Sequence, residues 1–309
     1  MASNVYEIIT DRIIEELEKG QIPWQRPWVC VGKGYGKAVS HTNGRPYSLL
    51  NQLLLGKPGE YITWNQCKKE GGSVKKGAKA RMVCFWKMLP VDKTDADGKP
   101  VMDENGKTAQ KIIPYLKYYN VFHIDDCDGI KAKYSNVTTP ATPATVAEID
   151  ANAEKLLRDY IAREGITLEE VESDEAYYSP AQDLIHLPMR KQFDKTAEYY
   201  STAFHESVHS TGHKSRLDRL TTGRAAAFGG QDYSKEELVA ELGAASICHA
   251  LGIETDSSFK NSAAYIQSWL KALRNDKRMV VTAASKAEKA VALIFGETET
   301  AEAADVAEA

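Results

Sequence analysis

The 309-residue sequence contains no run of about 18 apolar residues, the length from which a transmembrane helix is built. Its first residues, 1–7, show neither the basic segment nor the apolar segment of a secretory signal. Only five cysteines are present, and no two of them form a CxxC pair. Their odd number and wide spacing argue against a disulfide framework and against a zinc site made of thiolates. We therefore expect a cytoplasmic protein in a reducing environment.

Net charge is also low, at −4, but the charges are unevenly distributed. Residues 1–137 have six more basic than acidic residues, whereas residues 138–309 have ten more acidic than basic residues. Tryptophan follows the same division, because four of the five lie in the first 90 residues. The first half therefore suits an anionic partner, and the second half is expected to do something else.

The length suggests two domains, and one segment is a natural boundary between them. Residues 135–144 are uncharged, rich in Thr, Pro and Ala, and without helical or strand periodicity, which is typical of a semi-extended linker. The last 13 residues contain five acids and no base. We expect a first domain at 1–134, a linker at 135–147, a second domain at 148–296 and an acidic disordered tail at 297–309.

Both halves are predicted to be α+β, with short sheets among helices. In the first half, apolar residues at helical spacing predict a helix over 5–17. Segments 80–87 and 115–123 have the composition of strands. They are predicted to pair antiparallel across a polar excursion at 92–107, which gives a small mixed domain of helices and antiparallel sheet.

The second half combines several helical periods with one pair of short strands. The strands lie around a turn within 177–188, and Ser234 is predicted to be the N-cap of a long helix. The expected helices are 147–164, 196–211, 234–251, 259–274 and 283–294.

One of these helices contains an HExxH motif, His205-Glu206-Ser207-Val208-His209. Because residues i and i+4 lie on one helix face, both imidazoles can bind a single zinc ion. Glu206 projects next to that ion, where it can act as general base on the attacking water. The alternative is a helix with two surface histidines. A chance HExxH in this chain has odds of roughly one in a hundred, so the motif favours the metal site.

A catalytic zinc needs a third protein ligand. His213 extends the spacing, but it lies two helical turns from His205 and beyond Gly212, which is expected to end the helix. Glu237 and Glu241 share one face of an Ala-rich helix and are better candidates. The arrangement resembles the glutamate-type zincins, which implies Glu237 as the ligand and Glu241 as a partner that hydrogen-bonds a ligand histidine. The reverse assignment stays open.

Other residues of the second half fit a cleft that binds a peptide. Segment 183–187 is a candidate edge strand for pairing with an extended substrate. Tyr233 and His213 are candidates for stabilising the oxyanion of a tetrahedral intermediate. Arg216 and Arg219 are expected to form salt bridges or to contact solvent.

The first half combines bases with aromatic residues. Seven Lys and Arg residues and one acid, Glu70, lie within 63–87, together with Trp64, Phe85 and Trp86. This mixture favours single-stranded nucleic acid, whose bases stack on aromatic rings while Lys and Arg follow the phosphates. The alternative is that the Trp residues belong to the core and the Lys residues are only solvated. No RRM, KH, zinc-finger or P-loop signature is present.

These motifs together resemble the ArdC-type antirestriction proteins, whose N-terminal domain is shared with TraC-like primases. The resemblance covers about residues 4–275. In the first half it rests on five segments, 6–20, 22–28, 44–47, 51–55 and 72–79, followed by Tyr119-Asn120-Val121-Phe122. In the second half it rests on 205–209, 211–217 and 237–244. Ser48-Leu49 and His123 depart from the family pattern, which often has Arg-Gly and Asn at these positions.

The resemblance implies single-stranded DNA binding and protection of incoming DNA from restriction by a mobile element such as a conjugative plasmid. We expect a zincin-like metallopeptidase domain with one divalent metal, zinc before manganese or cobalt, held by His205, His209 and Glu237. A host defence protein is a candidate substrate. The alternative is a non-enzymatic DNA-coating protein whose metal is structural or vestigial. The candidate DNA contacts are Trp24, Arg26, Trp28, Arg45, Tyr47, Lys68, Lys69, Lys75, Lys76, Lys79 and Arg81.

Overall fold

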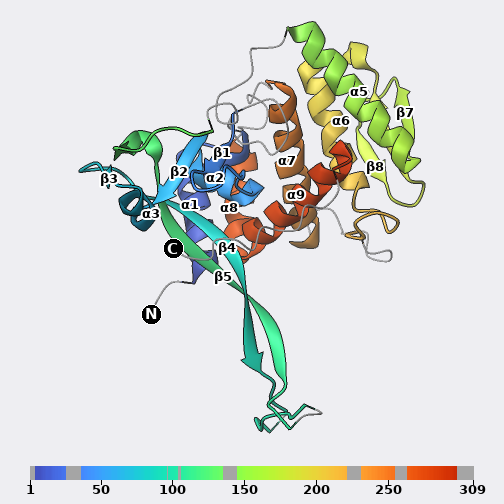
Figure 1. Cartoon of the computed structure of the whole chain (residues 1–309). Coiled ribbons are helices and arrows are strands. Elements are labelled where there is room, and N and C mark those ends of the chain that lie inside the picture. The colour runs from blue at the N-terminus through green and yellow to red at the C-terminus, as the bar shows by residue number, and fades with distance from the viewer. Residues whose placement is uncertain are drawn as a thin grey trace.

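The computed structural model describes residues 4–25, 36–95, 97–103, 106–134, 145–220, 231–254 and 263–297. Arg26, Trp28, residues 135–144 of the expected linker and the tail from residue 298 lie outside these ranges. The fold is mixed α/β, with largely antiparallel sheets, as the sequence predicts (Figure 1).

The N-terminal half begins with the predicted helix, α1 (Val5–Glu18). Asn4 caps it in a capping box with Glu7, so two of the free amides at the helix start are satisfied. A four-stranded sheet follows in the order β1-β2-β5-β4. Its strands are β1 (Ala38–Ser40), β2 (Gly59–Thr63), β4 (Arg81–Asp92) and β5 (Gln110–His123). The remaining elements are η1 (Pro23–Gln25), α2 (Leu49–Leu55), α3 (Trp64–Lys69), β3 (Ser73–Val74), η2 (Ile124–Asp126) and β6 (Cys127–Asp128).

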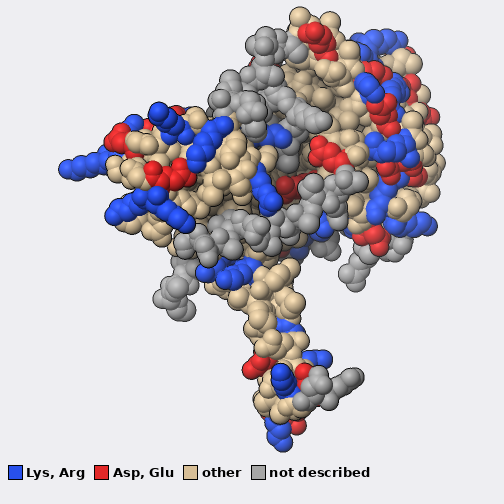
Figure 2. Space-filling view, viewed as in Figure 1, with Lys and Arg blue, Asp and Glu red and all other residues tan. Residues whose placement is uncertain are grey.

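Strands β4 and β5 form a long hairpin that projects from the body (Figure 1). They pair antiparallel as predicted, but each continues five residues farther outward than the composition of 80–87 and 115–123 indicates. The register is unbroken from the Arg81–Val121 pair to the Asp92–Gln110 pair. We call this hairpin, residues 81–123, the arm. In Figure 2 its shaft is mostly uncharged, and charged side chains gather at its far end.

The C-terminal half places a small sheet against helices. Its helices are α5 (Val146–Glu164), α6 (Thr196–Ser210), α7 (Gln231–Leu251), α8 (Ala263–Asn275) and α9 (Met279–Phe295), with η3 at Arg190–Gln192. Its strands, β7 (Thr167–Val171), β8 (Tyr177–Ser179) and β9 (Leu184–Pro188), lie in the order β7-β9-β8. Helix α5 starts within the expected linker, where Thr145 caps it.

Two predictions for this half are wrong. Ser234 does not cap α7, because the helix already begins at Gln231. Segment 183–187 is not an edge strand, because β9 is hydrogen-bonded on both sides, parallel to β7 and antiparallel to β8. Periodicity could not reveal this, since β7 carries an acidic sequence that does not alternate clearly.

The two halves share one hydrophobic core. A single cluster of buried residues joins α1 and α2 of the first half to α5–α9 of the second. Trp24, in η1, is 1% exposed and packs edge-on against Trp269 of α8, with ring centroids 5.8 Å apart. The hydroxyl of Thr10 donates to the backbone carbonyl of Lys277 at 2.7 Å. Among the described residues, every helix is too short or too polar to span a lipid bilayer.

Candidate metal centre

Helices α6 and α7 pack closely enough to face their side chains toward one another. The approach depends on Gly243, where a Cβ atom would lie 2.7 Å from Cγ2 of Val208. Ala240 is fully buried and Ala244 nearly so, which extends the small-residue surface of α7. The Ala- and Gly-rich composition of this helix therefore positions the site.

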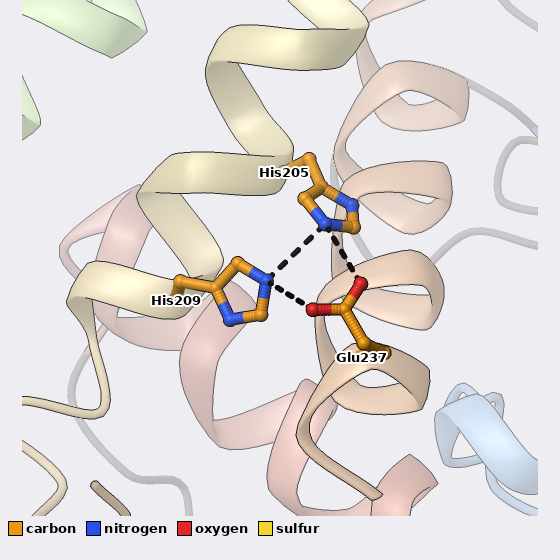
Figure 3. Close-up of side chains that lie close together, drawn as sticks. All are labelled: His205, His209 and Glu237. Atoms are coloured by element: carbon orange, nitrogen blue, oxygen red, sulfur yellow. Dashed lines mark hydrogen bonds and ion pairs between the residues drawn. The ribbon is translucent and has the colours of Figure 1, made fainter. Parts of the chain in front are cut away.

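At this contact, His205 and His209 of α6 face Glu237 of α7 (Figure 3). The Nε2 atoms of the two histidines are 3.2 Å apart. The Nε2 atom of His205 lies 3.5 Å from Oε2 of Glu237, and that of His209 lies 3.4 Å from Oε1. Their side chains are 15%, 14% and 25% exposed, so the group is sheltered but open on one side.

These separations fit a tetrahedral metal ion. With metal–ligand bonds of about 2.0–2.2 Å, the edges of a tetrahedron are about 3.3–3.6 Å long. The two imidazole nitrogens are 3.2 Å apart, and each lies 3.4 or 3.5 Å from a different oxygen of Glu237, so these separations fall close to that range. With one donor atom from each residue, all three atoms lie within 4.8 Å of one another. Two imidazoles and a carboxylate are also a donor set that borderline divalent cations accept. The residues present therefore fit a divalent metal with one corner left for a reactant.

Each histidine has a further carboxylate behind its outer nitrogen. The Nδ1 atom of His205 lies 3.9 Å from Oε1 of Glu241 and, though buried, has no hydrogen-bond partner among the described residues. The Nδ1 atom of His209 lies 3.6 Å from Oε1 of Glu236. A small shift would turn either contact into the carboxylate–histidine hydrogen bond that fixes the ring and directs Nε2 at a metal.

Negative charge dominates this environment. Burial alone would raise the pKa of Glu237, but contacts with the two histidines lower it well below its usual range. Burial alone would lower the pKa of His209, but the surrounding carboxylates raise it to about 10. The carboxylates of Glu236 and Glu237 raise the pKa of His209 through direct contact. The carboxylate of Glu206, which is 8% exposed, raises it through its charge. The centre is thus built to hold a cation.

Glu236, the partner of Arg219, is the residue that sequence reasoning missed. Arg219, only 5% exposed, donates to Glu236 at 2.8 Å, and it also bonds the hydroxyl of Thr211 at 2.7 Å and the carbonyl of Val208 at 2.8 Å. The sequence predicts a salt bridge or solvent contact for Arg219 but cannot name a partner, because Glu236 is 17 residues away. This arginine joins the end of α6 to the start of α7 beside His209.

The structure describes the side chains of His213 and Arg216 but not that of Tyr233. His213 is outside the described metal-binding group, and its Nδ1 atom is 2.7 Å from the hydroxyl of Ser215. Tyr233 belongs to α7, but its side chain lies outside the described residues. Arg216 forms the expected salt bridge, with Asp183, and also bonds the hydroxyl of Tyr178 at 3.1 Å. It ties the turn after α6 to the small sheet.

The candidate DNA contacts separate into buried and exposed residues. Trp24 and Tyr47 are 1% and 7% exposed, so neither presents its ring for stacking, and burial raises the pKa of Tyr47. Arg81 is half-buried and donates to the carbonyl of Leu55 at 2.8 Å. Lys68 lies over the exposed ring of Trp64, 4.0 Å from its centroid. The exposed candidates are Arg45, Lys68, Lys69, Lys75, Lys76 and Lys79.

Comparisons with known proteins find relatives of both halves of the chain. A profile of the N-terminal domain of anti-restriction factor ArdC matches residues 3–122, and a profile of a zincin-like metallopeptidase matches residues 153–286. The metal-free crystal structure of antirestriction protein ArdC from plasmid R388 is 33% identical, with a TM-score of 0.69 over 94% of this chain and 97% of that one. The Mn(II)-bound structure is 32% identical, with a TM-score of 0.68 over 95% and 98%.

Sequence relatives have other names. DNA primase TraC of Escherichia coli is 35% identical over 294 residues, and protein y4eC of Sinorhizobium fredii (strain NBRC 101917 / NGR234), which is uncharacterized, is 32% identical over 295 residues. The chain spans 26% of that TraC, 19% of a second TraC and 90% of y4eC. Since both domains match in order and the ArdC structures are covered almost end to end, the chain belongs to the ArdC family of antirestriction proteins and carries a zincin-like metallopeptidase domain.

Proposed function

We propose that the chain is a metal-dependent peptide hydrolase that also binds single-stranded DNA and protects the DNA of a mobile element from restriction. The observation that carries the hydrolase is the meeting of His205, His209 and Glu237 beside the buried Glu206. In this proposal His205, His209 and Glu237 hold the metal, and Glu241 orients the ring of His205.

The chemistry assigns one task to each side chain. When bound, a divalent cation polarises a carbonyl and makes water a stronger nucleophile at neutral pH. The carboxylate of Glu206 takes a proton from the attacking water and returns it to the departing amine. Glu241 and Glu236 hold the two imidazoles with their Nε2 atoms facing Glu237. An extended polypeptide is the proposed substrate. Strand β8, which flanks α6 and among the described strands pairs only with β9, replaces 183–187 as the strand proposed for pairing.

The proposed metal is zinc, with manganese or cobalt as alternatives. Two histidines and a glutamate suit all three ions. The Mn(II)-bound form of the R388 ArdC supports a divalent ion in this family without selecting among them.

Glu206→Gln tests the hydrolase. The variant should bind as much metal as the wild type, because Glu206 is not one of the three ligands, yet hydrolyse unfolded protein substrates at least about 100-fold more slowly. Glu198→Gln, in the first turn of the same helix, is the matched control and should retain activity. If Glu206→Gln hydrolyses candidate proteins and protects transferred DNA like the wild type, the hydrolase is refuted. The non-enzymatic DNA-coating protein then remains.

Single-stranded DNA binding rests on the charge of the first half. Its excess of Lys and Arg and the exposed lysines of α3 and the following segment provide a basic surface that suits an anionic ligand. No recognisable motif for reading a DNA sequence accompanies them. In Figure 2 Lys and Arg rim the lobe that carries α3 and β3. Oligo-dT binding by the full chain should weaken steeply with salt. Binding that does not change between low and high salt would contradict a phosphate-led mechanism.

A further inference from the structure

The register of the arm determines which side chains share a face. Because pairs such as Arg81–Val121 and Lys87–Tyr115 join odd-numbered residues, all odd-numbered positions of β4 and β5 lie on one face of the hairpin. We call this the odd face and its opposite the even face. The alternation of a strand thus converts sequence position directly into location.

Charge is completely segregated between the two faces. All four Lys and Arg residues of β4 and β5 lie on the odd face, at positions 81, 87, 111 and 117. The even face has no base, and its one charged residue is Asp92. No acid lies on the odd face. Every formal charge on the odd face of this projecting element is therefore positive.

Aromatic rings alternate with the lysine side chains on the odd face. Along β5 the odd face presents Tyr119, Lys117 and Tyr115 in turn, and along β4 it presents Phe85 and Lys87. Cross-strand pairing sets Phe85 beside Lys117 and Lys87 beside Tyr115, so aromatic rings and lysine side chains alternate both along and across the strands. Successive positions on one face are about 6.8 Å apart. We call these five residues the ladder.

The ladder is fixed at its inner end and open at its outer end. Phe85 and Tyr119 are half-buried, with ring centroids 6.1 Å apart, and Phe85 also contacts Tyr47 at 6.1 Å. The Nζ atom of Lys117 lies 5.9 Å from the ring centroid of Tyr119. Tyr115 is 49% exposed and the two lysines are exposed. The ladder therefore offers the ring of Tyr115 to solvent and the rings of Phe85 and Tyr119 in part, because these two pack against the buried cluster around Tyr47.

We propose that the ladder is a binding platform for single-stranded DNA, with bases stacked on Tyr115, Phe85 and Tyr119 and phosphates placed near Lys87 and Lys117. The proposal rests on the proposed DNA binding of the first half and locates part of it on the arm. Stacking requires unpaired bases, so the ladder selects a single strand over a duplex. Alternating rings and cations at a constant spacing match the alternation of base and phosphate along such a strand.

Tyr115 and Tyr118 provide a matched pair for the stacking test. The two tyrosines are 49% and 45% exposed, but they lie on opposite faces of the same strand. In full-length protein, Tyr115→Ala should weaken binding of a fluorescent oligo-dT by about 5- to 150-fold, the range seen for loss of one stacked base. Tyr118→Ala should bind like the wild type. Equal binding by both variants and the wild type would overturn the ladder.

Salt dependence tests the lysines independently of stacking. Lys87→Gln combined with Lys117→Gln should lower the slope of log affinity against log salt by about 1.4, because each lost phosphate contact removes about 0.7. Lys99→Gln combined with Lys107→Gln, near the far end of the arm, is the control and should leave the slope unchanged. If both double variants keep the wild-type slope, the platform is overturned. A wild-type affinity that still falls with salt would nevertheless support DNA binding by another surface. A wild type that binds no oligo-dT refutes the proposed DNA binding and the ladder together.

Discussion

The metal centre and the arm solve opposite problems. At the centre, two imidazole nitrogens and the carboxylate of Glu237 lie 3.2–3.5 Å apart at their nearest atoms on two packed helices, with carboxylates behind both histidines. The arm instead carries its chemistry on two strands that leave the body, where Tyr115, Ile112 and Met88 are 49–69% exposed. Reactions need fixed distances, whereas a flexible polymer needs an accessible surface. The difference indicates that substitutions at the centre act on geometry and those on the arm act on contact.

The variant expected to have the largest effect is His205→Ala, which removes a ligand from the metal centre and leaves the arm unchanged. Removing one of three donors should reduce bound metal from one ion per chain to none, because the remaining two cannot complete a tetrahedral site. Elemental analysis of the purified protein measures this. His213→Ala is the control and should retain the full metal content, since its Nδ1 atom faces Ser215 instead. A His205→Ala protein with full metal would refute the assigned site.

A smaller effect separates the ligand from its supports. Of the three glutamate variants, Glu237→Gln should cause the greatest loss of metal. Glu241→Gln and Glu236→Gln should each weaken metal affinity by about 10- to 100-fold. Competition with a chelator of known affinity gives these values. The opposite order, with Glu241 essential and Glu237 dispensable, would reverse the two roles that the sequence leaves open.

Stability should distinguish the inner from the outer part of the arm. Leu116 and Ile112 lie on the even face of β5, but Leu116 is 4% exposed and Ile112 is 69% exposed. Leu116→Ala should lower the free energy of unfolding by about 2–5 kcal/mol through lost packing. Ile112→Ala should change it by less than about 0.5 kcal/mol. Urea unfolding of both variants checks the pair, and equal losses would mean that the outer shaft is packed against something.

The smallest expected effect is the pH dependence of the ion pair between Asp183 and Arg216, which ties the turn after α6 to the small sheet. Burial raises the pKa of Asp183, but Arg216 and Tyr178 outweigh it and lower that pKa below its usual value. The resulting stability is complete above the unfolded pKa of about 3.9 and is lost as pH falls through the lower folded value. Asp183→Asn should therefore cost about 1 kcal/mol at pH 7.

The stability difference between Asp183→Asn and the wild type should shrink below pH 4. Urea unfolding at pH 7, 5 and 3 measures it, and oligo-dT binding by the arm at pH 7 should be unaffected. A difference that grows on acidification would contradict the assigned sign.

Local patterns predicted what local physics determines. His205 and His209 could be paired from sequence because the helical period alone brings residues four apart onto one face. Glu237 and Glu241 share a face for the same reason, so only the packing of α7 on α6 distinguishes them. Glu236 could not be found, since its partner Arg219 is supplied by a distant turn. Trp24 was misplaced because composition cannot distinguish a core tryptophan from a stacking one.

The sheet shows the same limit. Segments 80–87 and 115–123 were predicted as partners because their composition is that of strands. The outer five residues of each strand contain a proline, with Lys111 also present in β5, and were not recognised. Pairing across β4 and β5 supplies order that neither segment has alone. Strand β9 was taken for an edge because β7 left no clear pattern in the sequence.

The core that both halves share has a consequence for how this chain can be divided. Cutting at 135–144 would uncover Trp24 on one fragment and Trp269 on the other, together with the apolar faces of α1 and α2. The smallest piece that can fold with its interior intact is therefore the whole unit of two halves. Similarity to the much longer TraC accordingly runs through 294 residues and 92% of this chain without stopping at the boundary. We therefore expect a larger protein that carries this unit to carry both halves.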